Sequence, residues 1–348
     1  MTIRLQDVAA RAGVSVKTVS NVVHGHPHVS PATRGKVEDA LAELEYRPNL
    51  SARSLRRGRS EVVALAVPRL DTPYFAELAS ATVSAAAERG WTVLVDQTDG
   101  VADREREVLA GVRGHLIDGL VLSPMALDAA DVRSAPHTIP LVLLGERITN
   151  AAAHHLAVDN VAAARAATEH LLDSGRRRVA AIGCQAERLS ASGVAPLRQE
   201  GYRSALQQRG VGVDPRWMPL VQRYGRPEGA AAMRSLLDLD EPPDAVFCFN
   251  DVLALGALHE LARRGIRVPE DVAVMGFDDI EEGRFSSPTL STISQDKLRI
   301  ARTAVELLAE RIGSRSAEPA RDVTVPFELL ARQSTCAVVR RTGSGPAG

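Results

Sequence analysis

Apolar residues recur with a helical period between Leu5 and Val23. The positions expected on buried helix faces are Val8, Ala9 and Ala12 in a first helix, and Val16, Val19 and Val22 or Val23 in a second. Gly13 falls where the first helix must end, since a residue without a side chain adopts a left-handed backbone at little cost. Ser15 can cap the second helix by accepting a free N–H of its first turn. The pattern predicts two short helices joined by a tight turn.

A third helix is predicted over residues 30–44. Ser30 is a suitable N-cap, Pro31 fits the first helical position, and Val37, Leu41 and Leu44 form an apolar stripe. Two helices joined by a short glycine-containing turn make a helix-turn-helix, whose second helix can lie in the DNA major groove. Its outward residues are Ser15, Lys17, Thr18, Ser20, Asn21 and His24, nearly all hydrogen-bond donors. The same pattern also fits a helical hairpin packed against another part of the chain.

From Glu61 onward, short apolar runs alternate with longer helical segments. Strands are expected in 62–68, 91–97, 118–124, 140–146, 154–160, 177–185, 243–250, 272–278, at the start of 291–313 and within 324–334. Helices are expected in 72–90, 103–114, 160–175, 199–210, 226–239, 251–265 and the rest of 291–313. Continuous apolar strands separated by helices are typical of parallel sheets buried on both faces, with right-handed crossovers. The fold class is therefore α/β, with two doubly wound lobes.

The net charge of −1 is unevenly distributed. Residues 1–60 hold ten Lys/Arg and five Asp/Glu, giving +5, and the remainder holds 32 and 38, giving −6. A basic amino-terminal part indicates nucleic-acid binding by that part alone. Three widely spaced cysteines, Cys184, Cys248 and Cys336, match no metal or redox motif and are expected as buried, reduced thiols. With no secretory signal and no run that could span a bilayer, we expect a cytoplasmic protein without membrane contact.

Three sequence runs closely resemble the LacI/GalR family of transcriptional regulators. They are the opening DVAARAGVS and KTVS, the run VSPATRGKV followed by LEYRPN, and the stretch ARSL. The resemblance implies that ARSL folds into a hinge helix on operator DNA. Leu55, with Ala52 and Asn49 nearby, then matches the residue that wedges into the minor groove and kinks the duplex. An ordinary linker role is the alternative for Leu55.

The resemblance also implies the domain organisation. The expected parts are a three-helix DNA-binding head in 1–48, a hinge in 49–60, an effector-binding and dimerisation core in 61–340 and a disordered tail in 341–348. The core resembles periplasmic binding proteins, with a first lobe of about 61–160 and 291–323 and a second of about 161–290 and 324–340. Crossings between the lobes are expected near Asn160, Leu290 and Thr324.

Acidic and amide residues follow four of the predicted strands, in loops 68–75, 158–160, 249–251 and 277–279. Ligands of open α/β sheets bind outside the carboxyl ends of strands, so these loops mark a cleft. Carboxylates, amides and the aromatic pair Tyr74 and Phe75 suit a sugar or another small polyhydroxy or heterocyclic ligand.

The resemblance places effector contacts at Asp71, Tyr74, Phe75, Asp159, Arg198, Asn250, Asp251, Asp278 and Gln295. Asp159 and Asp251 have an alternative role as helix N-caps, because each follows a strand and precedes a helix. The loop before Arg198 departs from the family spacing. Tyr224 and Arg226 lie where the family supplies an aromatic residue, in a shortened loop.

Within the predicted recognition helix, the resemblance assigns base discrimination to Val16, Lys17 and Asn21. Asn21 replaces an arginine common in the family, and asparagine suits adenine where arginine suits guanine. Thr18 and Ser20 are expected to hold phosphates. Arg4 stands where the family has a Ser/Thr cap, with Thr2 as a possible substitute.

The run His24–His28 has alternating histidines that could hold a metal, but no acid or cysteine is close in sequence, and a surface turn contacting phosphates is favoured. No nucleophile elbow, phosphate-binding loop or metalloprotease motif is present, and neither catalysis nor a cofactor or metal is expected. Asp278 and Asp279, adjacent at a strand end, are expected to point in different directions.

The sequence thus predicts a homodimer, with a tetramer possible by pairing of dimers, that represses transcription. It would bind a palindromic, double-stranded operator and respond to a small-molecule effector, most simply a sugar, acting as inducer or co-repressor. A solute-binding protein for transport would lack the basic head, and a sugar-handling enzyme would need a catalytic motif.

Overall fold

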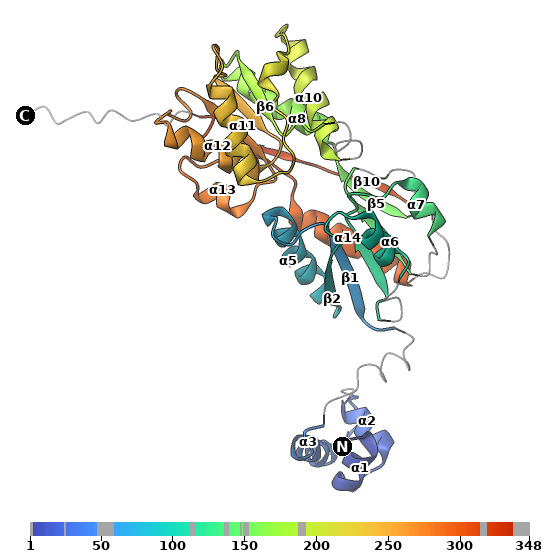
Figure 1. Ribbon diagram of the computed structural model, residues 1–348. Coiled ribbons are helices and arrows are strands. Elements are labelled where there is room, and N and C mark those ends of the chain that lie inside the picture. The colour runs from blue at the N-terminus through green and yellow to red at the C-terminus, as the bar shows by residue number, and fades with distance from the viewer. Residues whose placement is uncertain are drawn as a thin grey trace, which may run out of the picture. The chain divides into compact units, whose positions relative to one another are not determined.

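The structure is a computed structural model that divides into two units, residues 1–60 and 61–348 (Figure 1). It describes residues 3–23, 26–46, 59–111, 116–135, 139–146, 148, 153–186, 193–313 and 319–336. His24, Asn49, Ala52, Leu55 and the expected tail lie outside the described residues.

The amino-terminal unit contains the three predicted helices. They are α1 (Leu5–Ala12), α2 (Val16–Val23) and α3 (Pro31–Glu43). Their shared core consists of Val8, Ala9, Val19, Val22, Val37 and Ala40. Gly13 ends α1 with φ 65°. Both predicted caps are confirmed: Ser15 Oγ accepts from Thr18 N at 3.1 Å, and Ser30 Oγ accepts from Thr33 N at 3.3 Å.

One local expectation for this unit needs correction, and the other, Thr2 as a substitute cap, lies outside the described residues. Val16 is 41% exposed and stays outside the core, because it is the first residue of α2 and precedes the buried stripe. The start of α1 is secured without a Ser/Thr cap, because the Asp7 carboxylate accepts the backbone N–H of Arg4 at 2.7 Å. A carboxylate at the third helical position is the reciprocal half of a capping box.

The larger unit contains two sheets, each forming one lobe (Figure 1). The first has the order β10-β5-β4-β3-β1-β2, with β1 (Val62–Val67), β2 (Thr92–Gln97), β3 (Gly119–Leu122), β4 (Leu141–Leu144), β5 (His154–Val158) and β10 (Asp322–Val325). The second has the order β11-β9-β8-β7-β6, with β6 (Val179–Ile182), β7 (Ala245–Cys248), β8 (Ala273–Phe277), β9 (Ser291–Ser294) and β11 (Glu328–Leu330). All paired strands are parallel except β11 with β9.

Helices cover both faces of each sheet, as the apolar strands predict. In the first lobe these are α5 (Pro73–Ala87) and α14 (Lys297–Gly313) on one face, and α6 (Ala102–Leu109) and α7 (Ala129–Ser134) on the other. In the second lobe they are α8 (Asn160–Asp173) and α10 (Val194–Gln208) on one face, and α11 (Arg226–Leu237) and α12 (Asp251–Arg263) on the other. The short α7, η1 (Pro215–Trp217) and α13 (Glu281–Phe285) were not expected, because helices of at most six residues show no clear period.

Two glycines let helix pairs of the second lobe pack backbone to backbone. A Cβ on Gly201 of α10 would lie 2.2 Å from the carbonyl oxygen of Val161 in α8, and one on Gly256 of α12 would lie 2.1 Å from the carbonyl oxygen of Arg226 in α11. Such distances leave no room for a methyl group.

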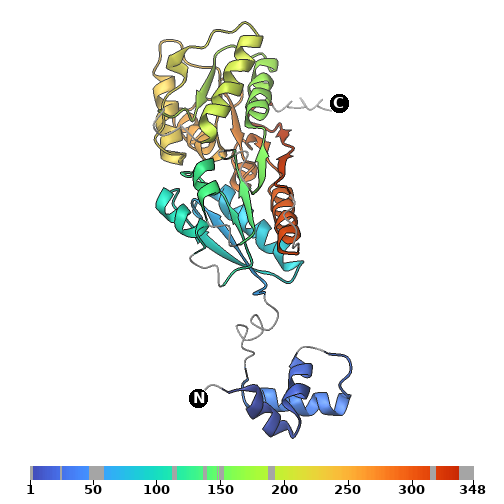
Figure 2. The ribbon, with the colours of Figure 1, turned by 90° about the vertical axis from the view of Figure 1, so that its right-hand side faces the viewer.

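The chain passes between the sheets after β5, after β9 and after β10. The second passage comes later than expected, because β9 pairs with β8 in the second sheet before α14 returns to the first lobe. The third lies directly after β10, which ends at Val325, one residue past Thr324. Figure 2 shows α14 beside the strands and helices of the first lobe, most of which come before residue 160 in the sequence.

Cys184 and Cys248 are buried, and burial raises the pKa of the Cys184 thiol to about 12. The expectation of a third buried thiol is wrong: Cys336 is exposed, because it follows β11 beyond the second-lobe core. Across the described ranges, no helix is long and apolar enough to cross a membrane.

Candidate functional site

A cavity of about 740 Å³ lies between the two lobes. Pockets for small organic ligands measure roughly 300–1,000 Å³, so its size is suitable. Seven of the nine expected effector residues line it: Asp71, Tyr74, Phe75, Arg198, Asn250, Asp278 and Gln295. Most of them follow the carboxyl ends of strands β1, β7, β8 and β9, as the rule for open α/β sheets requires.

Arg198, on α10, is held in one orientation inside the second lobe. Its Nε donates to Asn160 Oδ1 at 2.7 Å, and one terminal nitrogen donates to the carbonyl oxygen of Phe249. The guanidinium stacks on the ring of Phe277, 3.5 Å from its centre. The second terminal nitrogen lies 3.9 Å from Asp278 Oδ1. The residue is only 4% exposed and lines the cavity.

Asp278 follows β8 and reaches the same space. Its Oδ1 accepts from Gln295 Nε2 at 2.7 Å, which links the second lobe to the segment between β9 and α14. Burial raises the pKa of the Asp278 carboxyl to about 6, against the opposing effects of Arg198, Lys297 and Gln295. The backbone of Asp278 has φ 117°, a left-handed conformation that is strained for a residue with a side chain.

Asn250 has a structural role and a free donor. Its Oδ1 caps α12 by accepting from Leu253 N at 2.8 Å. Among the described residues, no partner occupies Asn250 Nδ2, Gln295 Oε1 or the second carboxylate oxygen of Asp278. All four polar side chains at this end of the cavity are at most 6% exposed. Buried polar groups normally have partners, so unused donors and acceptors here indicate a polar ligand.

Tyr74 and Phe75 form the apolar wall on the first lobe. Both lie in the first turn of α5, and their rings meet edge to face with centres 5.2 Å apart. Burial, with Asp278 and Glu146 nearby, raises the pKa of the Tyr74 hydroxyl and keeps it neutral. Asp71 stands at the exposed rim, where its ion pair with Arg69 lowers the pKa of its carboxyl. The cavity thus has an aromatic side, a hydrogen-bonding side and a charged rim.

The structure contradicts the expectation that Asp159 and Asp251 face this cavity. Asp159 caps α8, accepting from Ala162 N at 2.9 Å, as its alternative role predicted. Asp251 is fully buried and accepts from Thr292 Oγ1 at 2.7 Å and Ile280 N at 2.9 Å. It is not the cap of α12, because that position belongs to Asn250. Burial raises the pKa of the Asp251 carboxyl well above its usual range.

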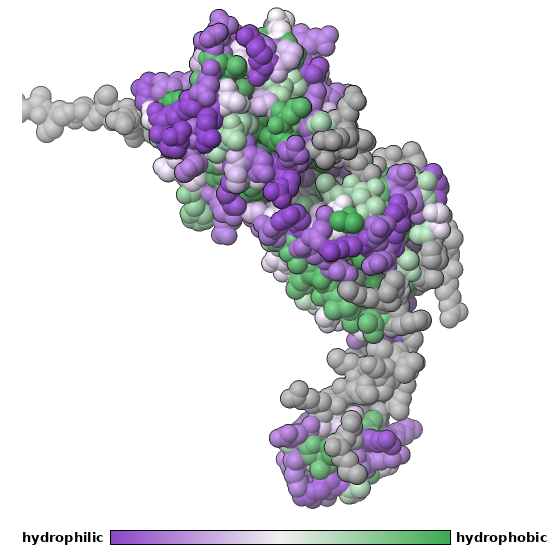
Figure 3. Space-filling view, in the orientation of Figure 1, coloured by the Kyte–Doolittle hydropathy of each residue, from purple (hydrophilic) through white to green (hydrophobic). Residues whose placement is uncertain are grey.

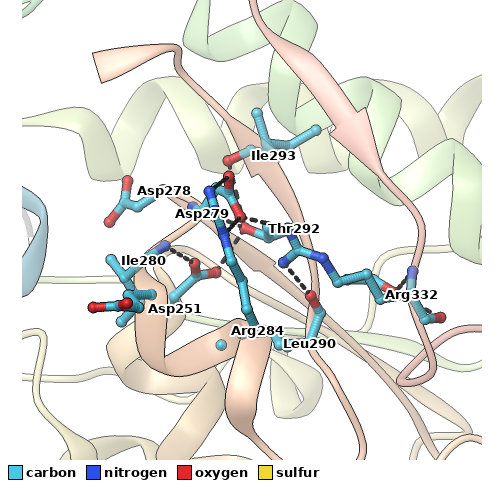
Figure 4. A network of polar contacts seen from close by, with 12 residues as sticks. Asp251, Asp278, Asp279, Ile280, Arg284, Leu290, Thr292, Ile293 and Arg332 are labelled. Carbon is cyan, nitrogen blue, oxygen red and sulfur yellow. Dashed lines mark hydrogen bonds and ion pairs between the residues drawn. The ribbon is translucent and has the colours of Figure 1, made fainter. Parts of the chain in front are cut away.

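Asp278 and Asp279 point in different directions, as expected for neighbours at a strand end. Asp279 pairs with Arg284 at 2.7 Å and with Arg332 at 2.6 Å. Figure 4 shows this cluster, with the carboxylate of Asp278 directed away from it. Asp279 therefore fixes the turn, and Asp278 is left for the cavity.

Several cavity residues were not singled out from the sequence. They are Arg69, Ser123, Glu146, Gln185, Gln222, Arg223 and Glu228. Ser123 and Glu146 follow β3 and β4, so the strand-end rule applied to every strand would have found them. Arg69 and Gln185 likewise follow strands, β1 and β6. Gln222 and Arg223 lie in the loop before α11 and Glu228 lies in its first turn, so these three reach the cavity through tertiary packing. Tyr224 and Arg226 also line the cavity, and the Tyr224 hydroxyl donates to the carbonyl oxygen of Gly183 at 2.8 Å.

In the amino-terminal unit, Ser15, Val16 and Lys17 are exposed at the start of α2, and Thr18, Ser20 and Asn21 are half-buried along it. Thr18 Oγ1 lies 2.9 Å from Ser15 Oγ, so these two hydroxyls also support the helix cap. Of the three alternating histidines, His26 and His28 are described and exposed. Within the described part of the chain, no group of three His, Cys, Asp or Glu side chains could hold a metal ion.

Comparison with known proteins accounts for both units. Residues 4–49 match the family of bacterial regulatory proteins, lacI family, and residues 168–335 match the periplasmic binding protein-like domain. The HTH-type transcriptional repressor CytR of Escherichia coli is 34% identical, over 96% of each chain.

Two solved structures cover nearly the whole chain. The transcriptional regulator CelR in complex with cellobiose is 31% identical, covers 95% of this chain and 99% of its own, and has a TM-score of 0.67. A lac repressor dimer bound to operator and the anti-inducer ONPF is 27% identical, covers 97% and 100%, and has a TM-score of 0.83. The chain belongs to the LacI family of bacterial regulatory proteins and is a DNA-binding transcriptional repressor with a periplasmic-binding-protein-like body.

Proposed function

We propose that this repressor binds a palindromic operator as a homodimer, and that a small polyhydroxy effector in the inter-lobe cavity controls it. The observation that carries the effector proposal is the set of four buried polar side chains with unused hydrogen-bonding capacity. Arg198 and Asn250 offer donors, and Asp278 and Gln295 offer acceptors. Neighbouring hydroxyls of a sugar, each both donor and acceptor, match this arrangement, and the sugar's apolar face matches Tyr74 and Phe75.

The charge of the cavity favours a neutral sugar over a phosphorylated one. Among the described lining residues, Arg69 pairs with Asp71, Arg198 lies 3.9 Å from Asp278, Arg223 pairs with Glu228 and Arg226 pairs with Glu282. A phosphate would have to displace one of these acids. The CelR–cellobiose complex is a relative of this kind with a neutral sugar.

Exposed apolar residues on both lobes support the homodimer. On the first lobe they are Val83 of α5 and Leu94 and Val95 of the edge strand β2, which are 45%, 38% and 37% exposed. Apolar residues gather over this end of the lobe in Figure 3. On the second lobe, Phe285 of α13 is 81% exposed. Burial of such patches against a second copy would remove apolar surface from water.

In the proposed mechanism α2 reads base edges with Val16, Lys17 and Asn21, and Thr18, Ser20 and His24 hold the backbone. The hinge around Asn49, Ala52 and Leu55 places an apolar wedge in the minor groove. Ligand binding changes the relative angle of the lobes and so the separation of the two hinges. A ligand can shift this equilibrium only if its affinities for the DNA-competent and DNA-incompetent states differ. It is an inducer if it prefers the incompetent state and a co-repressor if it prefers the competent state. Such a repressor acts in the cytoplasm, where its operator lies.

The proposal is tested by a thermal-shift screen of neutral sugars, sugar phosphates, nucleosides and nucleobases, followed by gel-shift titration of DNA upstream of the gene. A bound effector raises the midpoint of unfolding by mass action. We expect a neutral sugar to stabilise the protein and to change operator affinity. Stabilisation by none of these classes, or a ligand that leaves operator affinity unchanged, would contradict effector control. Absence of salt-dependent binding to the upstream DNA would contradict repression.

A further inference from the structure

Glu77 binds the second lobe through one carboxylate oxygen and Lys297 of the first lobe through the other. It lies on α5, one turn after Tyr74. Its Oε1 accepts the backbone N–H of Glu281, the first residue of α13 in the second lobe, at 2.9 Å. Its Oε2 pairs with Lys297 Nζ at 3.1 Å. The helix that carries the aromatic wall of the cavity is therefore tied to the opposite lobe.

Lys297 sits where the chain returns to the first lobe, as the first residue of α14. Besides Glu77, its Nζ donates to the carbonyl oxygens of Asp278 and Asp279, the latter at 3.0 Å. An ammonium group has three N–H donors, and these three partners use all of them. The side chain is 12% exposed and that of Glu77 is 31% exposed, so solvent screens this pair less than a fully exposed pair.

The two carbonyls that Lys297 binds belong to a strained turn. Asp278 and Asp279 have φ of 117° and 51°, conformations that residues with side chains adopt only when their surroundings enforce them. Arg284 and Arg332 hold the side chain of Asp279 (Figure 4). Lys297 holds the main chain of the turn by its bonds to the two carbonyl oxygens. The same turn directs the Asp278 carboxylate toward Arg198 and Gln295.

We infer that Glu77 and Lys297 form an inter-lobe clasp, which holds the cleft closed and fixes the turn that presents Asp278 to the cavity. Neither residue lines the cavity, so both are positioning residues that act through the turn at Asp278 and the contact between the lobes. If the cavity binds the proposed effector, the clasp couples ligand binding to lobe closure at Asp278, and this consequence rests on the proposed function. The clasp itself is a property of the protein without ligand.

The test uses hydrogen–deuterium exchange of the full-length protein without any ligand. Glu77→Gln and Lys297→Met are compared with Glu88→Gln and Arg302→Met, a control pair formed by the residue that ends α5 and a residue of α14. Glu88 and Arg302 are 4.0 Å apart, exposed and within one lobe. We expect about tenfold faster exchange in peptides covering 72–80 and 278–286 for the clasp variants, and wild-type exchange for the controls. Exchange at wild-type rates in the clasp variants, or equal acceleration in the controls, would overturn the inference.

Two further variants separate a clasp from general loss of stability. The double variant Glu77→Gln/Lys297→Met should accelerate exchange by less than the product of the two single effects, because residues of one pair are coupled. Lys297→Arg retains the charge and should restore most of the protection. Acceleration in the double variant equal to the product of the two single effects would show that the two residues act separately. Since no effector is used, these outcomes do not depend on whether the protein binds a sugar.

Discussion

The guanidinium of Arg198 lies 3.5 Å from the centre of the Phe277 ring, so the cation that faces the cavity is stacked on the last residue of β8. The stacking and the bonds to Asn160 and Phe249 together fix a planar group with several donors. A lysine has neither the planar face nor the fork of donors. The geometry of Arg198 therefore depends on its chemical type as well as its charge.

Arg198→Lys should weaken effector binding at least tenfold in calorimetry with the ligand found by the screen. It should also lower the free energy of unfolding by about 1–3 kcal/mol, because the buried acceptors of Asn160 and Phe249 lose a partner. Arg203→Lys, on the exposed side of the same helix, serves as the control. Unchanged affinity in Arg198→Lys would remove Arg198 from the proposed contacts.

Asp278 should make stability depend on pH in a defined window. Its pKa is about 6 when folded, above the ordinary value of 3.8, so between these values the folded protein retains a proton that the unfolded chain has lost. Its contribution to the free energy of unfolding therefore falls as pH rises from about 4 to 6, by up to about 3 kcal/mol. Denaturant titrations of wild type and Asp278→Asn from pH 4 to 7 measure the difference. Parallel profiles of the two proteins would contradict this, and Asp71→Asn, at the exposed rim, should leave the profile between pH 5 and 7 unchanged, because the lowered pKa of Asp71 acts only below that range.

Gly201→Ala should lower the free energy of unfolding by at least about 2 kcal/mol, because the new methyl group overlaps the backbone of α8. Gly35→Ala in α3 is the matched control: its Cβ meets nothing within 4 Å, and alanine favours a helix by about 0.5–1 kcal/mol. Thermal unfolding of the two variants should thus move in opposite directions. A Gly201→Ala protein as stable as the wild type would mean that α8 and α10 are farther apart.

Leu55→Ala tests the hinge proposal. If Leu55 wedges into the minor groove, operator affinity should fall about 100-fold or more, since the kinked duplex loses its apolar insert. Binding to unrelated DNA depends on phosphate contacts and should change little. Fluorescence anisotropy with both DNAs at one salt concentration measures the ratio. Equal losses on the two DNAs would assign Leu55 an ordinary linker role.

Phe285→Asp should shift the protein from dimer toward monomer in sedimentation velocity, because a charge replaces an apolar side chain that is 81% exposed in the single chain. Leu220→Asp is the control, an apolar residue 67% exposed in a loop of the second lobe. We expect the control to sediment as the wild type does. A dimer unaffected by Phe285→Asp would exclude α13 from the interface.

The sequence by itself determined the element types, because they depend on local chemistry. Periodic valines, a glycine turn and the Ser15 and Ser30 caps determine the three helices of the head. Apolar runs that end in acidic or amide residues determine the parallel strands and the edge at which ligand groups gather. The family resemblance then placed seven of nine residues at a cavity that the structure contains.

Tertiary structure alone decided what each polar strand-end residue does. Asp251 and Asn250 are neighbours in sequence, yet one accepts from Thr292 and Ile280 inside the core and the other faces the cavity. No local pattern places Asp251 in the core, because its two partners are 29 and 41 residues away. The contact between Glu77 and Glu281 spans 204 positions and exists only because the chain passes between the lobes three times. The free energy of a buried charged group depends on its hydrogen-bond and ion-pair partners. Where these partners are distant in the sequence, only the tertiary fold brings them into contact with it.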